Sequence, residues 1–64
     1  MAELTLTPNI DGGDDFYAEL IGAHEGLSRE ESEAYNARLL LVLANHIGDR
    51  DVLKAAIDAA KRKD

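Results

Sequence analysis

The segment from Asn36 to Gly48 is the most apolar stretch of this chain, and it constrains the fold more than any other feature. Its sequence, NARLLLVLANHIG, contains no proline, and its single glycine stands at its end. When residues 34–47 are projected at 100° per residue, apolar side chains occupy nearly the whole circumference of a helix. A surface helix in a small helical domain needs only one apolar stripe, so this helix has to be covered on more than one side.

The flanking segments and the central helix differ in how much apolar surface they offer. The flanking segments offer small, alanine-rich apolar faces that cover only part of the central helix. The remaining apolar surface predicts a protein partner or a homodimer, because large exposed apolar patches on small proteins are usually interaction sites. We expect the interaction face to consist of the apolar residues of the central helix: Leu39, Leu40, Leu41, Val42, Leu43, Ala44 and Ile47.

The ends of the central helix are marked by strong local signals. Residues 28–31 read SREE, a capping box in which Ser28 and Glu31 satisfy each other's backbone N–H groups. No glycine or proline follows until Gly48, which is a typical residue for ending a helix. These signals predict a helix over about 29–47.

Two shorter helices are predicted on either side. The DGGD turn at residues 11–14 places Asp14 as the N-cap of a helix over about 15–25, and Gly26 is the residue expected to end it. Asp49 is placed to cap a third helix over about 50–62, which keeps one apolar face. The first ten residues alternate apolar and β-branched side chains up to Pro8, which favours extended backbone.

The expected fold is therefore all-α. Residues 1–13 form an extended arm and turn, and residues 14–64 form a small three-helix bundle that we expect dimerisation or a partner to complete. A chain of 64 residues is one domain at most and buries only about 60% of the surface that its unfolded form exposes. It contains no cysteine, so disulfides cannot reinforce it.

The charge of −6 is concentrated in the first half of the chain. Residues 1–33 carry nine acids and one base, a net charge of −8, whereas residues 34–64 carry four acids and six bases, a net charge of +2. This balance argues against nucleic-acid binding, and the basic residues 61–63 are better explained as a complement to the negative end of the third helix. No segment has the length of a membrane span or the pattern of a signal peptide, so we expect a cytoplasmic protein without membrane contact.

Five polar residues interrupt or face the central helix, and they are the candidates for chemistry. Their first interpretation is structural, since buried amides and imidazoles need hydrogen-bond partners. Neither histidine has a metal-ligand pattern, no catalytic constellation is present, and we expect no cofactor, no metal site and no enzymatic activity. Small-molecule binding at a subunit seam stays open as the alternative. The polar cluster consists of His24, Asn36, Arg38, Asn45 and His46.

Two motifs resemble a family of short bacterial proteins classified as a domain of unknown function. Residues 16–28 match FYxxLIxAHxGLS, and residues 36–49 match NARLxLxLANHIGD. The resemblance implies a helical fold in a bacterial cytoplasm and transfers no catalytic residues. Genes of such proteins often lie near those of flavin-dependent aromatic hydroxylases, which implies an accessory subunit.

The sequence thus favours a non-catalytic helical interaction module. The alternative is a ligand-binding or catalytic-accessory protein whose polar cluster is completed by another chain. An acidic regulator that mimics nucleic acid is a third class, and it depends on charge alone.

Overall fold

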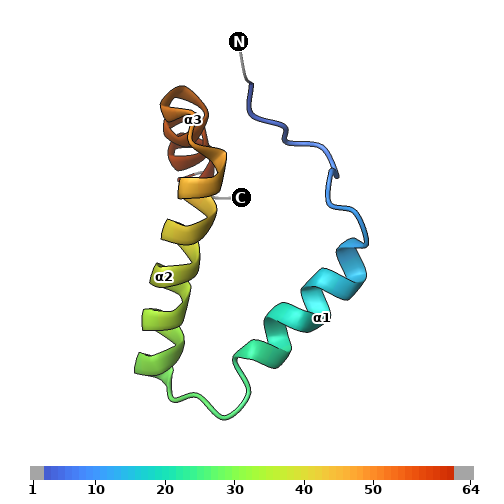
Figure 1. The fold of residues 1–64 in the computed structure, drawn as a ribbon, viewed down its shortest axis with the longest axis vertical. Helices are drawn as coiled ribbons and strands as arrows, with labels where there is room; N and C mark the ends of the chain where they lie inside the picture. Colours follow the sequence, from blue (N-terminus) through green and yellow to red (C-terminus); the bar gives the residue numbers. More distant parts are fainter. Residues whose placement is uncertain (1–2, 62–64) are drawn as a thin grey trace.

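The structure is a computed structural model that describes residues 3–61 of the chain. It contains the helices α1 (Gly13–Ala23), α2 (Arg29–Ile47) and α3 (Arg50–Ala60), and the described residues form no β-strand (Figure 1). The all-α, three-helix fold expected from the sequence is confirmed. None of the described helices combines the length and the apolar character needed to cross a bilayer.

Both ends of α2 follow the predicted signals. The backbone N–H of Glu31 donates to Ser28 Oγ at 3.1 Å, and the N–H of Ser28 donates to Glu31 Oε1 at 2.8 Å, which completes the capping box. At the other end, Gly48 adopts a left-handed φ of 72° and its N–H donates to the carbonyl of Ala44 at 2.9 Å. α2 therefore begins and ends where local chemistry satisfies its terminal backbone groups.

Helix α3 begins one residue after Asp49, as predicted. The N–H of Val52 donates to Asp49 Oδ1 at 3.0 Å, which makes Asp49 the N-cap. The helix ends at Ala60 with Lys61 as its cap, and the predicted end at residue 62 lies outside the described residues. Of the basic residues 61–63, only Lys61 is described, and it lies 3.9 Å from an exposed carboxylate of Asp58.

The predicted start of α1 was wrong in its capping residue. Gly12, not Asp14, is the N-cap; it has a left-handed φ of 61°, and its carbonyl accepts from the N–H of Phe16 at 2.9 Å. Because Gly12 adopts this conformation without a side-chain penalty, the helix starts at Gly13, and Asp14 falls in its first turn. There the carboxylate still lies near the positive end of the helix dipole.

The same helix ends at Ala23, two residues before the predicted end. His24 takes the C-cap position, and its side chain bonds back to the carbonyl of Leu20, one of the last carbonyls of the helix. Gly26, which was predicted to end this helix, lies instead in the turn that follows it, with a left-handed φ of 80°.

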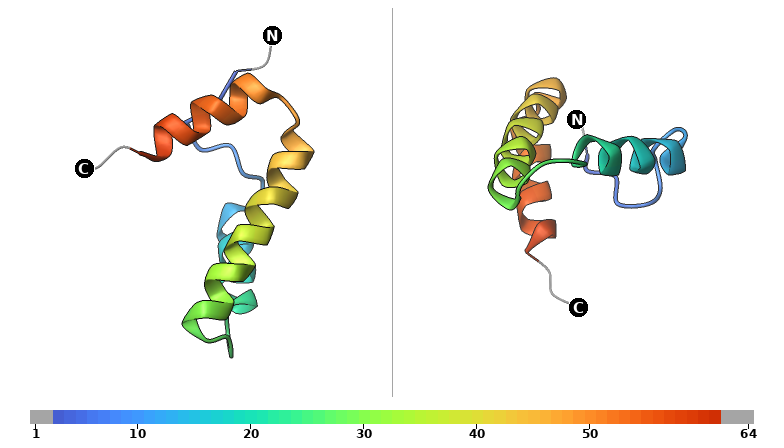
Figure 2. Two further views of the ribbon diagram at one scale, coloured as in Figure 1. Left: turned by 90° about the vertical axis from the view of Figure 1, so that its left-hand side faces the viewer. Right: turned by 90° about the horizontal axis from the view of Figure 1, so that it is seen from below.

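The three helices form an open arrangement. The backbones of α2 and α3 meet, whereas within the described residues α1 makes no comparable approach to either of them. Figure 1 shows α1 diverging from α2 at the connection between them, and Figure 2 shows α3 turned sharply from the axis of α2. Residues 3–10 have no regular secondary structure and continue from α1 along the open side.

This arrangement leaves the described residues without a buried core. No described residue is buried, and the chain has an accessible surface of 6010 Å². A compact protein of 7.0 kDa is expected to expose about 4,000 Å². The Cα radius of gyration is 13.5 Å, compared with about 11 Å for a compact chain of this length. Apolar side chains that a compact domain would bury therefore stay accessible to solvent.

Candidate functional site

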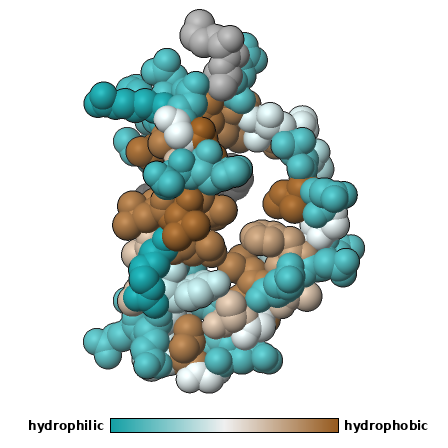
Figure 3. Space-filling view, in the orientation of Figure 1, coloured by the Kyte–Doolittle hydropathy of each residue, from teal (hydrophilic) through white to brown (hydrophobic). Residues whose placement is uncertain are grey.

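An apolar groove between α2 and α3 is the main concave feature of the structure. Its volume is about 600 Å³, and among the described residues Asn36 is its only polar lining residue. Figure 3 shows apolar side chains gathered on the side of the α2–α3 unit that faces the open part of the molecule. We refer to it as the groove, and its lining residues are Asn36, Leu39, Leu40, Leu43, Ala44 and Ile47 of α2 and Leu53, Ala56, Ile57 and Ala60 of α3.

The sequence builds this groove from two amphipathic stripes and one turn. The α2 residues recur at intervals of three and four, which aligns them along one side of the helix. The α3 residues follow the same spacing. Gly48 ends α2 and Asp49 starts α3 immediately afterwards, so the two apolar stripes are joined by a short turn and form two walls of one groove.

The predicted interaction face is accessible and extends beyond the groove. Leu40 is 64% exposed and lines the groove, whereas Leu41 and Val42 are 66% and 65% exposed and lie outside its lining. Apolar surface therefore continues around α2. The sequence analysis did not include the α3 wall in this face, although the apolar stripe of residues 53–60 carried the signal.

The polar residues of α1 and α2 meet at one point. His24 Nδ1 donates to the carbonyl of Leu20 at 2.7 Å, and its Nε2 lies 2.9 Å from Asn36 Oδ1. If the ring carries a proton on both nitrogens, it donates both hydrogen bonds. If only Nδ1 carries a proton, Nε2 is an acceptor, and the side-chain amide of Asn36 is flipped so that its NH₂ group donates to Nε2. The Tyr35 ring contacts the same imidazole edge to face, with centroids 5.0 Å apart. Asn36 thus links α2 to the end of α1.

The other three members of the polar cluster do not join this contact. Among the side-chain hydrogen bonds and ion pairs formed within residues 3–61, none involves Arg38, Asn45 or His46, and all three are exposed. At 100° per residue they lie on other sides of α2 from Asn36. In the described part of the chain, no three histidine or carboxylate side chains gather as a metal site would require.

We expect His24 and Asn36 to stabilise the chain jointly. Replacing either residue by alanine should lower the free energy of unfolding by about 1 kcal/mol. The double variant should lose less than the sum of the two single losses, because both substitutions remove the same hydrogen bond between His24 and Asn36. Chemical denaturation of the four proteins measures this coupling. His46→Ala is the matched control, since this histidine forms no such bond with the described residues. Strictly additive losses would contradict the coupling.

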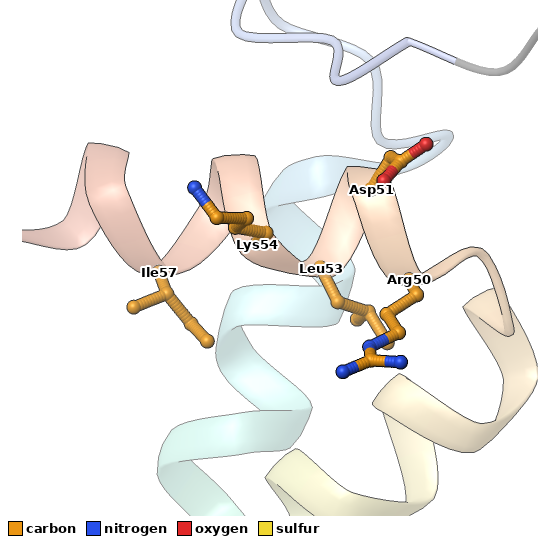
Figure 4. Close-up of a pocket in the computed structure, with 5 residues that line it drawn as sticks. All are labelled: Arg50, Asp51, Leu53, Lys54 and Ile57. Carbon is orange, nitrogen blue, oxygen red and sulfur yellow. The ribbon is translucent and has the colours of Figure 1, made fainter.

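A second hollow lies on α3 alone. Its volume is about 510 Å³, and it is lined by Arg50, Asp51, Leu53, Lys54 and Ile57. In Figure 4, Arg50 and Leu53 point toward the end of α2, while Asp51 and Lys54 point to the other side of the helix. Its described lining residues all come from one helix, so they supply one wall of the hollow and no opposing one.

Comparisons with known proteins identify a family without assigning an activity. No curated protein and no solved structure matches the chain. A family model does match, and it covers residues 4–62, which include all three helices and most of the arm. The chain therefore belongs to the family described as "Protein of unknown function (DUF2783)".

Proposed function

We propose that this protein is a non-catalytic helical interaction module, or a small accessory subunit, that works in the cytoplasm by binding another protein chain through the groove. The observation that carries this proposal is the combination of an aliphatic groove with the absence of buried residues among those described. A chain with this distribution of apolar surface gains stability when a partner covers it.

The groove has the chemistry of a helix-binding surface. Its two walls are aliphatic, and Asn36, the one polar lining residue within residues 3–61, already has His24 as a partner. Amphipathic helices dock into such grooves through residues spaced like Leu39, Leu43 and Ile47. Covering one leucine side chain contributes about 1.5–3 kcal/mol, so a few such contacts supply the affinity of a stable complex.

The non-catalytic part of the proposal follows from the scarcity of reactive groups around the groove. General acid–base chemistry needs a titratable side chain in a pocket, and none of the described residues that line the groove is titratable. Binding of a polar small molecule through the polar cluster would require groups from a second chain, because Arg38, Asn45 and His46 of one chain do not join the contact between His24 and Asn36. This alternative has no supporting contact among the described residues.

The resemblance of the two sequence motifs supports one class of larger partner, the flavin-dependent enzymes of aromatic catabolism. In such a complex the chain would be the accessory subunit, and its acidic first half would orient the encounter with basic surface on the enzyme.

Thermal unfolding of the isolated chain at sub-micromolar concentration tests the proposal. Far-UV circular dichroism should show a broad loss of helix without a cooperative transition, because a single chain lacks a core. The strongest control is the same chain at a thousandfold higher concentration or with a candidate partner added. A sharp, concentration-independent transition in the dilute monomer would show a self-sufficient fold and would contradict the proposal.

A further inference from the structure

We infer that the groove is occupied by a second copy of this chain, so that the folded unit is a two-fold symmetric homodimer. This inference rests on the proposed function, because it names the partner of the same groove. Three properties of the structure carry it: the amount of accessible surface, the position of the apolar residues around α2, and the distribution of charge.

The accessible surface matches the requirement of a homodimer. The chain exposes 6010 Å², which exceeds the surface of a compact protein of its mass by about 2,000 Å². Two copies that bury this excess against each other form an interface of about 4,000 Å² in total, within the range of roughly 2,000–5,000 Å² found for obligate homodimers. A standard interface with a different protein buries only about 800 Å² on each partner, which would leave more than half of the excess uncovered.

The apolar surface also has the distribution that a second copy covers well. A two-fold interface uses the same patch on both chains, so an apolar patch meets an equally apolar patch. Ile57 on α3 is 60% exposed at the groove, and Leu41 on α2 is 66% exposed outside it. Figure 3 shows a gap with side chains drawn, and apolar residues on different sides of α2 are exposed, so a second copy has access to α2 from more than one side.

Charge favours an antiparallel pairing of the two copies. The first 33 residues carry a net charge of −8 and the remainder carries +2. On α1 the charged residues are Asp14, Asp15 and Glu19, a net charge of −3, whereas α3 carries two bases, Arg50 and Lys54, and two acids, Asp51 and Asp58, and has no net charge. A two-fold axis that places the acidic half of one chain beside the basic half of the other reduces like-charge repulsion and adds attraction.

Single-cysteine variants provide a direct test, because the natural chain contains no cysteine. Ile57→Cys places a thiol in the groove, and Ala55→Cys, its control, places one on the same helix at a position outside the groove lining. In a lone chain both positions are exposed and should react with a thiol reagent at similar rates. The mass of each variant is measured by sedimentation equilibrium under the same conditions, and its helicity by circular dichroism.

The inference predicts a mass twice the 7.0 kDa of one chain and slow labelling of Ile57→Cys relative to Ala55→Cys, with the difference lost on dilution. A doubled mass without protection of Ile57→Cys would place the dimer interface elsewhere and overturn the inference. A poorly helical 7.0 kDa monomer would overturn the second copy as occupant while leaving the proposed interaction module intact. A helical monomer with a protected groove would show that α1 closes over the groove within one chain, and it would overturn both.

Discussion

Replacing Leu43 by aspartate is expected to leave the chain monomeric and largely without helix. Leu43 lies in the middle of the α2 wall of the groove and is 48% exposed in the single chain, so a partner has substantial apolar surface to cover there. In a two-fold dimer the substitution acts twice, once in each chain. An aspartate at this position also brings an unpaired charge into the interface.

The size of this effect follows from the apolar contribution alone. Leu43 is 48% exposed in the single chain, so a partner covers about half of its side chain, which contributes roughly 0.75–1.5 kcal/mol in each copy. The two side chains together contribute about 1.5–3 kcal/mol per dimer, and their loss raises the dissociation constant by about 10- to 100-fold. Sedimentation equilibrium measures the dissociation constant, and circular dichroism at the same chain concentration measures the loss of helix.

Ala55→Asp is the matched control for this variant. It adds the same charge at an exposed position of α3 that does not line the groove, and its expected cost is only the difference in helix propensity, roughly 0.5–0.7 kcal/mol. If the two variants weaken association equally, the effect is one of charge rather than of the groove. If Leu43→Asp remains as helical and as associated as the natural chain, the groove is not an interface.

The contrast between the two ends of α2 and the start of α1 shows what local sequence could predict. The SREE capping box and Gly48 each have one strongly preferred geometry, and the structure adopts both. The DGGD turn offered two solutions, a side-chain cap from Asp14 or a left-handed glycine at Gly12, and the chain uses the glycine. Helix ends are therefore predictable where a single local solution exists, and uncertain where glycine adds another.

The candidate site was less predictable because it depends on contacts between helices. The projection of α2 correctly indicated more apolar surface than two small helices would cover, yet it could not indicate that α3 supplies the second wall of the groove. The polar cluster was predicted from residue type, and the structure separates its five members: Asn36 meets His24, while Arg38, Asn45 and His46 lie elsewhere around α2. Residue type indicates which side chains need partners, whereas helix packing decides which of them meet.

Gly48 ends α2 and also sets the turn that places the α3 wall of the groove against the α2 wall. A β-carbon at this position would meet only ordinary contact, 3.8 Å from the carbonyl oxygen of Asn45, so there is room for alanine. The backbone φ of 72° is the obstacle, because left-handed geometry costs a residue with a side chain about 1–2 kcal/mol. Gly48→Ala should therefore destabilise the fold through its backbone and, by relaxing the turn, change the angle at which α3 meets α2.

Gly22→Ala makes the same glycine-to-alanine change at a position where we expect it to stabilise the chain. Gly22 lies inside α1 without a positive φ, and an added β-carbon would have no neighbour within 4 Å. Alanine should stabilise the helix there by about 0.5–1 kcal/mol. At equal chain concentration we expect Gly48→Ala to lower the Tm by at least about 4 °C and Gly22→Ala to raise it or leave it unchanged. Equal effects of the two variants would mean that the turn tolerates other conformations, and the groove would then not be fixed by Gly48.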